Sequence, residues 1–285
     1  MLTRGNGTTG RGLGLLSAVV AAAVSAAACT RKVEPVGSLT ITPTVIQLPY
    51  PHDVALRLEW KPRARLDKQS GNVNVFAHLL ERPGKVLRTF DHRFPGEWKP
   101  GQPRSYEIDI FQSALGEELP PGRYLLTFGL YDDSVGYRWP LQVQGEDVGK
   151  REYQLAIVEV PENVPSPSFE FLGAWLPLAK GADQQILGRR GLNGAASIRV
   201  SKLDSPGTVR LAVSVPGSPV ATAVDVASDC AEERKEVPAP GFSWIGFTVA
   251  RSDGGPCELR FSADPRNASQ SVPMSLEVLA WRTAR

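Results

Sequence analysis

The amino-acid sequence predicts an all-β protein with two consecutive antiparallel β-sandwich domains, of the immunoglobulin-like or jelly-roll-like kind. Short stretches in which apolar and polar side chains alternate recur along the chain, as expected of strands with one buried face. The 27 glycines and 24 prolines punctuate the chain and favour turns between these stretches. No stretch keeps a sustained helical period. With 285 residues, the chain is long enough for two domains that each bury a core.

Residues 1–28 are predicted to be a signal peptide. Arg4 and Arg11 precede an apolar segment that begins at Leu13 and continues through small residues to Ala28, the plan of a secretory signal. This segment has about 16 residues, whereas a membrane-spanning helix needs about 20. We therefore expect the leader to be removed during export.

The end of this leader, Ser25-Ala26-Ala27-Ala28-Cys29, resembles a bacterial lipobox, although Ala26 stands where lipoboxes prefer Leu. The resemblance implies that Cys29 becomes the lipidated first residue and carries palmitate or a similar chain. The protein would then be anchored to a membrane of the bacterial cell envelope, with residues 29–37 as a tether. Thr30, which is not Asp, favours the outer membrane or cell surface. The alternative is ordinary Ala-x-Ala cleavage, which leaves Cys29 as a free thiol.

Cys230 and Cys257 form an even pair once Cys29 is set aside. In the oxidising compartment that the leader implies, we expect them to form a disulfide. The bridge closes a loop of about 27 residues, which corresponds to about 3 kcal/mol of stabilisation. A metal or redox pair is the competing interpretation, but the sequence has neither a CxxC motif nor a histidine near these cysteines.

The charge balance argues against nucleic acid as a partner. Two of the 32 basic residues, Arg4 and Arg11, lie in the leader, so the basic and acidic residues of the mature chain balance. Binding of nucleic acid draws on a concentrated positive field. The clearest basic cluster, between Lys61 and Lys68, is interpreted as a solvated loop, with an anionic membrane surface or polysaccharide as the alternative.

The first domain is predicted to span residues 38–160. Pro83-Gly84 joins two of its strands in a hairpin. Pro120-Pro121-Gly122 forms a rigid turn before a central strand whose side chains at Tyr124, Leu126 and every second position after them share one face. The predicted strands of this domain are Ser38–Leu48, Val54–Trp60, Val73–Leu80, Val86–Phe90, Arg123–Tyr131 and Glu152–Val160.

Several motifs of this domain carry a resemblance to a known family. They are Phe76-Ala77-His78-Leu79-Leu80, the Pro-Gly-Lys turn, Trp98-Lys99-Pro100-Gly101-Gln102, Pro120-Pro121-Gly122-Arg123-Tyr124 and Gly129-Leu130-Tyr131-Asp132. Their order resembles the extracytoplasmic β-sandwich region of multi-spanning, polyprenyl-phosphate-dependent glycosyltransferases. The resemblance implies a sandwich fold and an extracytoplasmic location. It implies no transferase activity, because the chain lacks their multiple membrane segments and catalytic loop.

Residues 161–167, PENVPSP, contain three prolines and are predicted to link the two domains. The second domain is predicted to span residues 168–285. Its strand candidates follow at the regular spacing of an all-β fold. They are Ser168–Leu178, Ala196–Val200, Thr208–Val215, Val220–Ala227, Phe242–Ala250, Cys257–Ala263 and Met274–Arg282.

We predict no catalytic residue, metal ligand or cofactor. His92 beside Asp91 is not expected to form a dyad, because adjacent strand residues face opposite sides. Glu107 and Asp109 would share one strand face, but nothing in their spacing requires the opposed carboxylates of a glycosidase. Asp132-Asp133-Ser134 offers oxygen ligands for calcium, although such turns are usually solvated.

The aromatic residues are the main sign of a ligand. Core packing explains most of the tryptophans. Trp98 and Trp139 lie near turns and prolines, so we expect them to expose rings on which a ligand could stack. The sequence thus predicts a non-catalytic envelope lipoprotein that binds envelope glycan or a protein partner. The alternatives are a carbohydrate-active hydrolase with an unrecognised carboxylate pair and a structural accessory subunit of an envelope or export complex.

Overall fold

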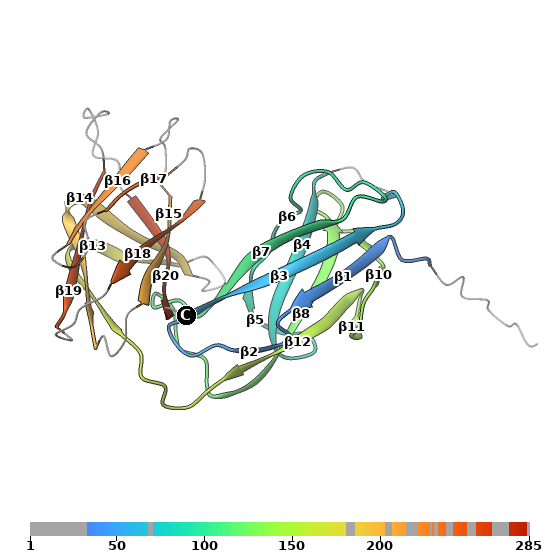
Figure 1. Cartoon of the computed structure of the whole chain (residues 1–285), viewed down its shortest axis with the longest axis horizontal. Helices are drawn as coiled ribbons and strands as arrows, with labels where there is room; N and C mark the ends of the chain where they lie inside the picture. Colours follow the sequence, from blue (N-terminus) through green and yellow to red (C-terminus); the bar gives the residue numbers. More distant parts are fainter. Residues whose placement is uncertain are drawn as a thin grey trace, which may run out of the picture. The chain divides into compact units, whose positions relative to one another are not determined.

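The structure is a computed structural model, and it describes residues 33–67, 71–180, 186–202, 207–214, 222–228, 230, 233–237, 242–249, 255–263 and 274–283. Residues 34–285 form one compact unit. The secondary structure of its described residues consists of strands (Figure 1). The described residues contain no helix long and apolar enough to cross a membrane. The predicted all-β class is therefore confirmed.

The first β-region, residues 37–160, contains two sheets. One sheet has the strand order β10-β1-β3-β7, and the other has the order β11-β12-β8-β4-β5, with β2, β6 and β9 paired at its margins. These strands are β1 (Gly37–Thr42), β2 (Val45–Gln47), β3 (Asp53–Pro62), β4 (Val73–Arg82), β5 (Lys85–Thr89), β6 (His92–Arg93), β7 (Arg104–Phe111), β8 (Gly122–Asp132), β9 (Arg138–Trp139), β10 (Leu141–Gln142), β11 (Glu146–Gly149) and β12 (Glu152–Val160).

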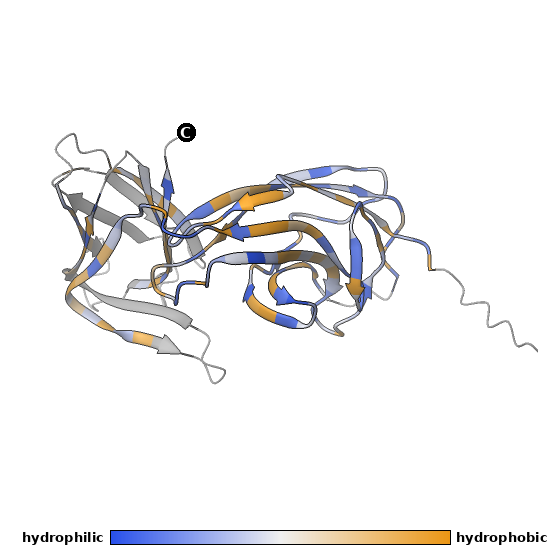
Figure 2. Cartoon of the chain, turned by 90° about the horizontal axis from the view of Figure 1, so that it is seen from below, coloured by the Kyte–Doolittle hydropathy of each residue, from blue (hydrophilic) through white to orange (hydrophobic). Residues whose placement is uncertain are grey.

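Alternating side chains place one core between these two sheets. In β8, the predicted central strand, Tyr124, Leu126, Phe128 and Leu130 are all buried in that core. In β3, Leu56, Leu58 and Trp60 are buried, while the intervening residues face solvent. Figure 2 shows this alternation as hydrophobic and hydrophilic segments that follow one another along the strands. The period-2 pattern therefore reports the buried face of each strand.

The structure changes the prediction at the first strand. The expected strand Ser38–Leu48 is divided into β1, which pairs with β3, and β2, which pairs with β12 in the other sheet. The division falls at Pro43, which has no N–H to donate to a ladder. β1 also pairs in parallel with β10, and β2 in parallel with β12, so the sheets are not purely antiparallel.

The second β-region, residues 168–283, forms a third sheet with the order β17-β16-β19-β14-β20-β15-β18, and β13 also pairs with β14. Its strands are β13 (Ser168–Lys180), β14 (Ile186–Ser201), β15 (Gly207–Ser214), β16 (Thr222–Ser228), β17 (Glu233–Val237), β18 (Phe242–Val249), β19 (Cys257–Ala263) and β20 (Met274–Thr283). Side chains from β14, β15, β18, β19 and β20 share one core. The predicted division into two domains at residues 161–167 remains a prediction, although the sheets change between β12 and β13.

A buried ion cluster joins β3 and β7 to β15 and β20. Asp53 has no exposed side-chain surface, and its carboxylate accepts hydrogen bonds from Nε and Nη2 of Arg282. Asp109 accepts from Arg210 Nη2 at 2.6 Å and from Arg282 Nη2 at 2.5 Å. Arg210 Nε lies 3.4 Å from Asp53 and makes no hydrogen bond. Two carboxylates and two guanidinium groups therefore neutralise one another, with Asp53 fully buried and the other three side chains partly exposed.

Backbone hydrogen bonds along β20 reinforce this junction. The amide of Ala114 donates to the carbonyl of Leu279 at 2.7 Å, and the amide of Trp281 donates to the carbonyl of Pro51 at 2.8 Å. Ser113 Oγ accepts from the amide of Leu279 at 3.1 Å. Loops that flank β3 and β7 thus satisfy backbone groups of β20 that its own sheet leaves unpaired, which protects the strand edge.

We expect Asp53→Ala to lower the free energy of unfolding by about 2 kcal/mol, because it leaves the partly buried guanidinium groups short of negative charge. Urea unfolding followed by tryptophan fluorescence measures this change. Glu59→Ala, on the exposed face of the same strand, is the control. It breaks only a surface pair with Arg57 and should cost at most about 1 kcal/mol. Equal losses in the two variants would contradict the role given to the cluster.

Candidate functional site

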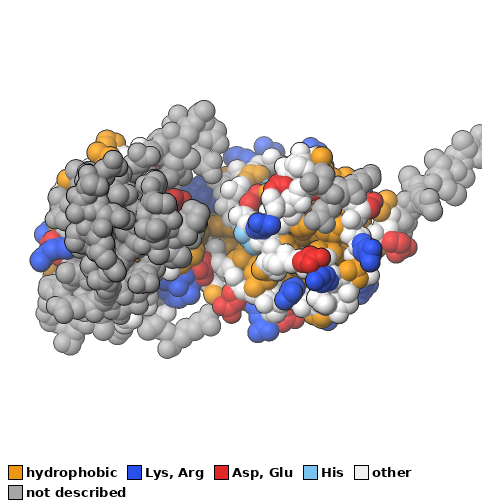
Figure 3. All heavy atoms as spheres, turned by 90° about the horizontal axis from the view of Figure 1, so that it is seen from above, with side chains coloured by type: hydrophobic (Ala, Val, Ile, Leu, Met, Phe, Trp, Pro, Cys, Tyr) orange, Lys and Arg blue, Asp and Glu red, His pale blue; other side chains and the backbone are white. Residues whose placement is uncertain are grey.

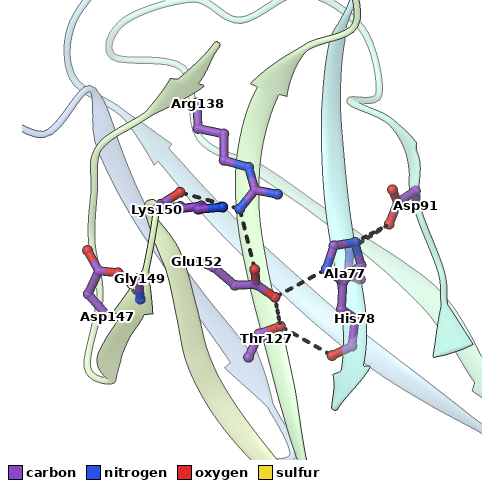
Figure 4. A network of polar contacts seen from close by, with 9 residues as sticks. All are labelled: Ala77, His78, Asp91, Thr127, Arg138, Asp147, Gly149, Lys150 and Glu152. Atoms are coloured by element: carbon purple, nitrogen blue, oxygen red, sulfur yellow. Dashed lines mark hydrogen bonds and ion pairs between the residues drawn. The ribbon is translucent and has the colours of Figure 1, made fainter. Parts of the chain in front are cut away.

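A network of polar side chains lies on the outward face of the sheet that contains β4, β8 and β12 (Figure 4). His78 comes from β4, and Thr127 lies directly opposite it on β8. Glu152 is the first residue of β12. The residues on either side of His78 point into the core, so the alternation of β4 turns the imidazole outward.

His78 lies between two carboxylates. Its Nδ1 is 3.1 Å from Glu152 Oε1, and its Nε2 is 3.4 Å from Asp91 Oδ1. Asp91 follows β5 and also accepts a hydrogen bond from the amide of Ala77 at 3.1 Å. The side chain of His78 is only 12% exposed, whereas that of Asp91 is 37% exposed.

Glu152 connects the remaining members of the network. Thr127 Oγ1 donates to Glu152 Oε1 at 2.7 Å, and Arg138 Nη1 lies 3.3 Å from Glu152 Oε2. The same Arg138 nitrogen donates to the carbonyl of Lys150 at 3.3 Å. Both carboxylate oxygens of Glu152 therefore have partners, and the network connects β4, β8, β9 and β12.

The guanidinium of Arg138 also packs against an aromatic ring. It lies 4.2 Å from the centre of the Phe76 ring, which stacks on His78 at 4.9 Å between ring centres. Gly129 on β8 allows this stack, because a Cβ at that position would collide with the Phe76 ring. The cation–π contact and the ion pair together fix the orientation of Arg138.

The network holds His78 and Glu152 in their charged forms. Burial by itself lowers the pKa of His78, but hydrogen bonds and charge attraction from Asp91 and Glu152 outweigh it and raise the pKa to about 9. Burial raises the pKa of Glu152, but its bonds to His78 and Thr127 and the charge of Arg138 lower it to about 2. At neutral pH the imidazolium keeps its proton and Glu152 stays ionised. This arrangement is suited to donating and accepting hydrogen bonds, and poorly suited to proton transfer.

Trp98 and Trp139 do not expose their rings, so this prediction was wrong. Trp98 is 7% exposed and donates to the carbonyl of Ala64 at 3.0 Å. Trp139 is fully buried and donates to the carbonyl of Asp67 at 2.8 Å. Both indoles enter the core of the first β-region because their ring N–H groups find loop carbonyls there. Neither ring offers a stacking surface to a ligand.

His92 and Asp91 face different partners, as their adjacency in the chain predicts. His92 Nε2 lies 2.8 Å from the hydroxyl of Tyr106, and its Nδ1 lies 3.0 Å from the carbonyl of Phe90. Burial lowers the pKa of His92 more than its contact with Phe90 and the charge of Asp91 raise it. Asp91 instead turns to His78.

The structure describes two of the three cysteines. Cys230 and Cys257 form a disulfide, with their Cα atoms 5.8 Å apart. The predicted lipidation site, Cys29, lies outside the described residues.

The Asp132 carboxylate accepts hydrogen bonds from backbone amides and from the Ser134 hydroxyl. Its Oδ1 accepts from the amide of Ser134 at 2.9 Å and from the Ser134 hydroxyl at 2.6 Å, and its Oδ2 accepts from the amide of Gly71 at 2.9 Å. These bonds tie the β8–β9 turn to the segment before β4. Within the described ranges, no three His, Cys, Asp or Glu side chains gather as a metal site.

A pocket of about 640 Å³ opens elsewhere in the unit. The loop between β2 and β3, the loop between β7 and β8, the segment Val164–Phe169 and Lys202 line it. Tyr50 and Glu118 are among its lining residues, and none of its lining belongs to the network around His78.

No protein-family model matches the chain, and no curated protein matches it. Similar solved structures include a carbohydrate-binding module of the β-sandwich superfamily, with 11% identity and a TM-score of 0.29 over 87% of this chain and 97% of that one. An exo-β-1,3-galactanase from Phanerochaete chrysosporium has 13% identity and a TM-score of 0.28 over 81% of this chain and 56% of that one. The C-terminal globular domain of an oligosaccharyltransferase from Pyrococcus abyssi has 10% identity and a TM-score of 0.17 over 82% of this chain and 45% of that one.

These three likenesses are weak, with TM-scores below 0.3. At such low identities and TM-scores, they carry no argument about function. The chain spans only about half of the galactanase and oligosaccharyltransferase chains that it resembles.

The three histidines should titrate differently, which proton NMR of the imidazole ring protons measures. We expect His78 to titrate near pH 9, because the carboxylates around it stabilise its proton. His52 and His92 should titrate below 6.5, since burial lowers the pKa of both. The stability that His78 contributes is complete below its unfolded pKa of about 6.5 and is lost as the pH rises through 9. A His78 midpoint below 7 would contradict the network.

Proposed function

We propose that this protein is a non-catalytic, lipid-anchored binding module of the bacterial cell envelope, with envelope glycan as its ligand. The network around His78 is its proposed contact surface. The observation that supports binding over catalysis is the pairing within that network: both ring nitrogens of His78 and both carboxylate oxygens of Glu152 already have partners, which holds the two groups in their charged forms.

The exposed members of the network suit a ligand rich in hydroxyl groups. The side chains of Asp91 and Arg138 are 37% and 30% exposed. A carboxylate accepts, and a guanidinium donates, two hydrogen bonds in fixed geometry, which matches neighbouring sugar hydroxyls. Because Phe76 and Glu152 already orient Arg138, less rotamer freedom is lost when a ligand binds.

A glycoside hydrolase is the second candidate. Asp91 and Glu152 both lie against His78, which gives the two carboxyl groups that such an enzyme requires. However, the acid of that pair must hold a proton at working pH, and the low pKa of Glu152 opposes this. The low pKa of Glu152 therefore argues against it as the acid of such a pair.

The disulfide and the predicted leader support the proposed location in the cell envelope. Disulfides persist in oxidising compartments, where exported proteins fold.

The surface charge bears on the kind of glycan. Figure 3 shows acidic and basic side chains interspersed over the visible described face of the first β-region, without a large area of one sign. This mixture favours a neutral glycan over a polyanion.

The glycan proposal predicts that Arg138→Ala lowers affinity for isolated envelope glycan about tenfold, because it removes a charge-assisted donor. Co-sedimentation of the full chain with insoluble glycan measures the affinity. Arg57→Ala is the matched control, since Arg57 is an exposed arginine on β3 of the other sheet. Equal affinities in both variants, with folding intact, would contradict the proposed surface. Capture of an envelope protein with no glycan binding would favour the accessory-subunit alternative instead.

The anchor predicts that Cys29→Ala abolishes incorporation of a labelled palmitate analogue and moves the protein from the membrane fraction to the soluble fraction. A single acyl chain holds a protein only weakly, so the complete lipid modification is needed for stable attachment. Cys230→Ala serves as a control that should leave labelling unchanged. Labelling that persists in Cys29→Ala would rule out the lipobox.

A further inference from the structure

The pocket of about 640 Å³ contains charges of both signs. Glu118, in the loop between β7 and β8, and Lys202, directly after β14, both line it and are both exposed. Among the described residues, neither side chain forms an ion pair with the other or with a third group. The pocket therefore presents an available anion and an available cation to the same ligand.

The walls between these charges combine polar surface with apolar rings. Tyr50 and Phe169 supply aromatic rings, and Pro51, Pro165 and Pro167 supply flat aliphatic rings. Burial raises the pKa of the Tyr50 phenol, and the negative charge of Glu118 raises it further, so the ring and the carboxylate are neighbours. The volume falls within the range of small-molecule sites, about 300 to 1,000 Å³.

Prolines also determine the hydrogen bonds that the wall can make. Pro165 and Pro167 have backbone carbonyls but no N–H, so their part of the wall can only accept. Ser166 Oγ between them is occupied by contacts of 3.3 Å to His52 Nε2 and to the carbonyl of Val164. The carbonyls of Pro165 and Pro167 suit a ligand that carries N–H groups, as a peptide does.

The backbone at the pocket is in a rare conformation. Lys202 has a φ of 61°, and Asn163, next to the segment that lines the pocket, has a φ of 52°. Left-handed conformations of residues other than glycine are uncommon and concentrate at binding sites. Here the one at Lys202 belongs to the residue that supplies the positive charge.

We propose that this pocket binds a short peptide with both termini free, whose ammonium group pairs with Glu118 and whose carboxylate pairs with Lys202. The apolar side chains of the peptide pack against Tyr50, Phe169 and the prolines. Its amide N–H groups donate to the proline carbonyls. The proposal is separate from glycan binding at the network around His78 and does not depend on it.

Isothermal titration of the full chain in detergent with the tripeptide Ala-Ala-Ala tests this assignment. We expect saturable binding, and we expect Glu118→Gln and Lys202→Met each to weaken it about tenfold, because each removes one charge-assisted contact. Glu117→Gln, next to Glu118 but outside the lining, is the matched control and should bind as the original chain does.

Blocked peptides distinguish the two charged contacts. N-acetyl-Ala-Ala-Ala should lose its sensitivity to Glu118→Gln but keep that to Lys202→Met, and Ala-Ala-Ala amide should do the reverse. Absence of tripeptide binding to the correctly folded chain would overturn the proposal. Equal binding of free and doubly blocked tripeptide, or binding of a neutral disaccharide that displaces the tripeptide and ignores both substitutions, would also overturn it.

Discussion

The structure depends on the burial of every second side chain between facing strands. In the first β-region, Leu56 and Leu58 of β3 meet Leu126 and Phe128 of β8 in a common core, and the alternate positions face outward. Such burial contributes about 25 cal/mol per Å² of apolar area and is the main favourable term in folding. It also fixes which side chains are left on the outer face of each sheet, and so it decides where a ligand can be recognised.

The outer face of β4, β8 and β12 shows this consequence. Three strands that are distant in sequence place His78, Thr127 and Glu152 next to one another. Partly removed from water, these groups are stable only when they pair, and pairing fixes their charges. A surface of this kind offers oriented hydrogen bonds from groups whose charges are fixed by their partners. The pocket that contains Tyr50 and Glu118 differs, because its charges remain available and its walls come from loops and the first residues of β13.

The sequence predicted the strands more reliably than the positions of particular side chains. Period-2 alternation located β3, β4, β8 and β12, because burial on one face imposes that pattern directly. The pairing of Cys230 with Cys257 followed from counting cysteines. The change of sheet at Pro43 and the parallel pairings were missed, since alternation does not say which sheet a strand joins.

The side chains of the site were harder to predict for the same reason. Nearby prolines and turns suggested that Trp98 and Trp139 are exposed, but loop carbonyls satisfy their N–H groups inside the core. Glu152 lies 74 residues from His78, and no local motif marks that contact.

The most direct test is to incubate the protein with isolated envelope glycan and to measure, in one sample, the co-sedimented protein and any new reducing ends. We expect the protein to co-sediment with the glycan, and we expect the number of reducing ends to stay at the level of a sample without protein. New reducing ends that disappear in Glu152→Gln would contradict this expectation.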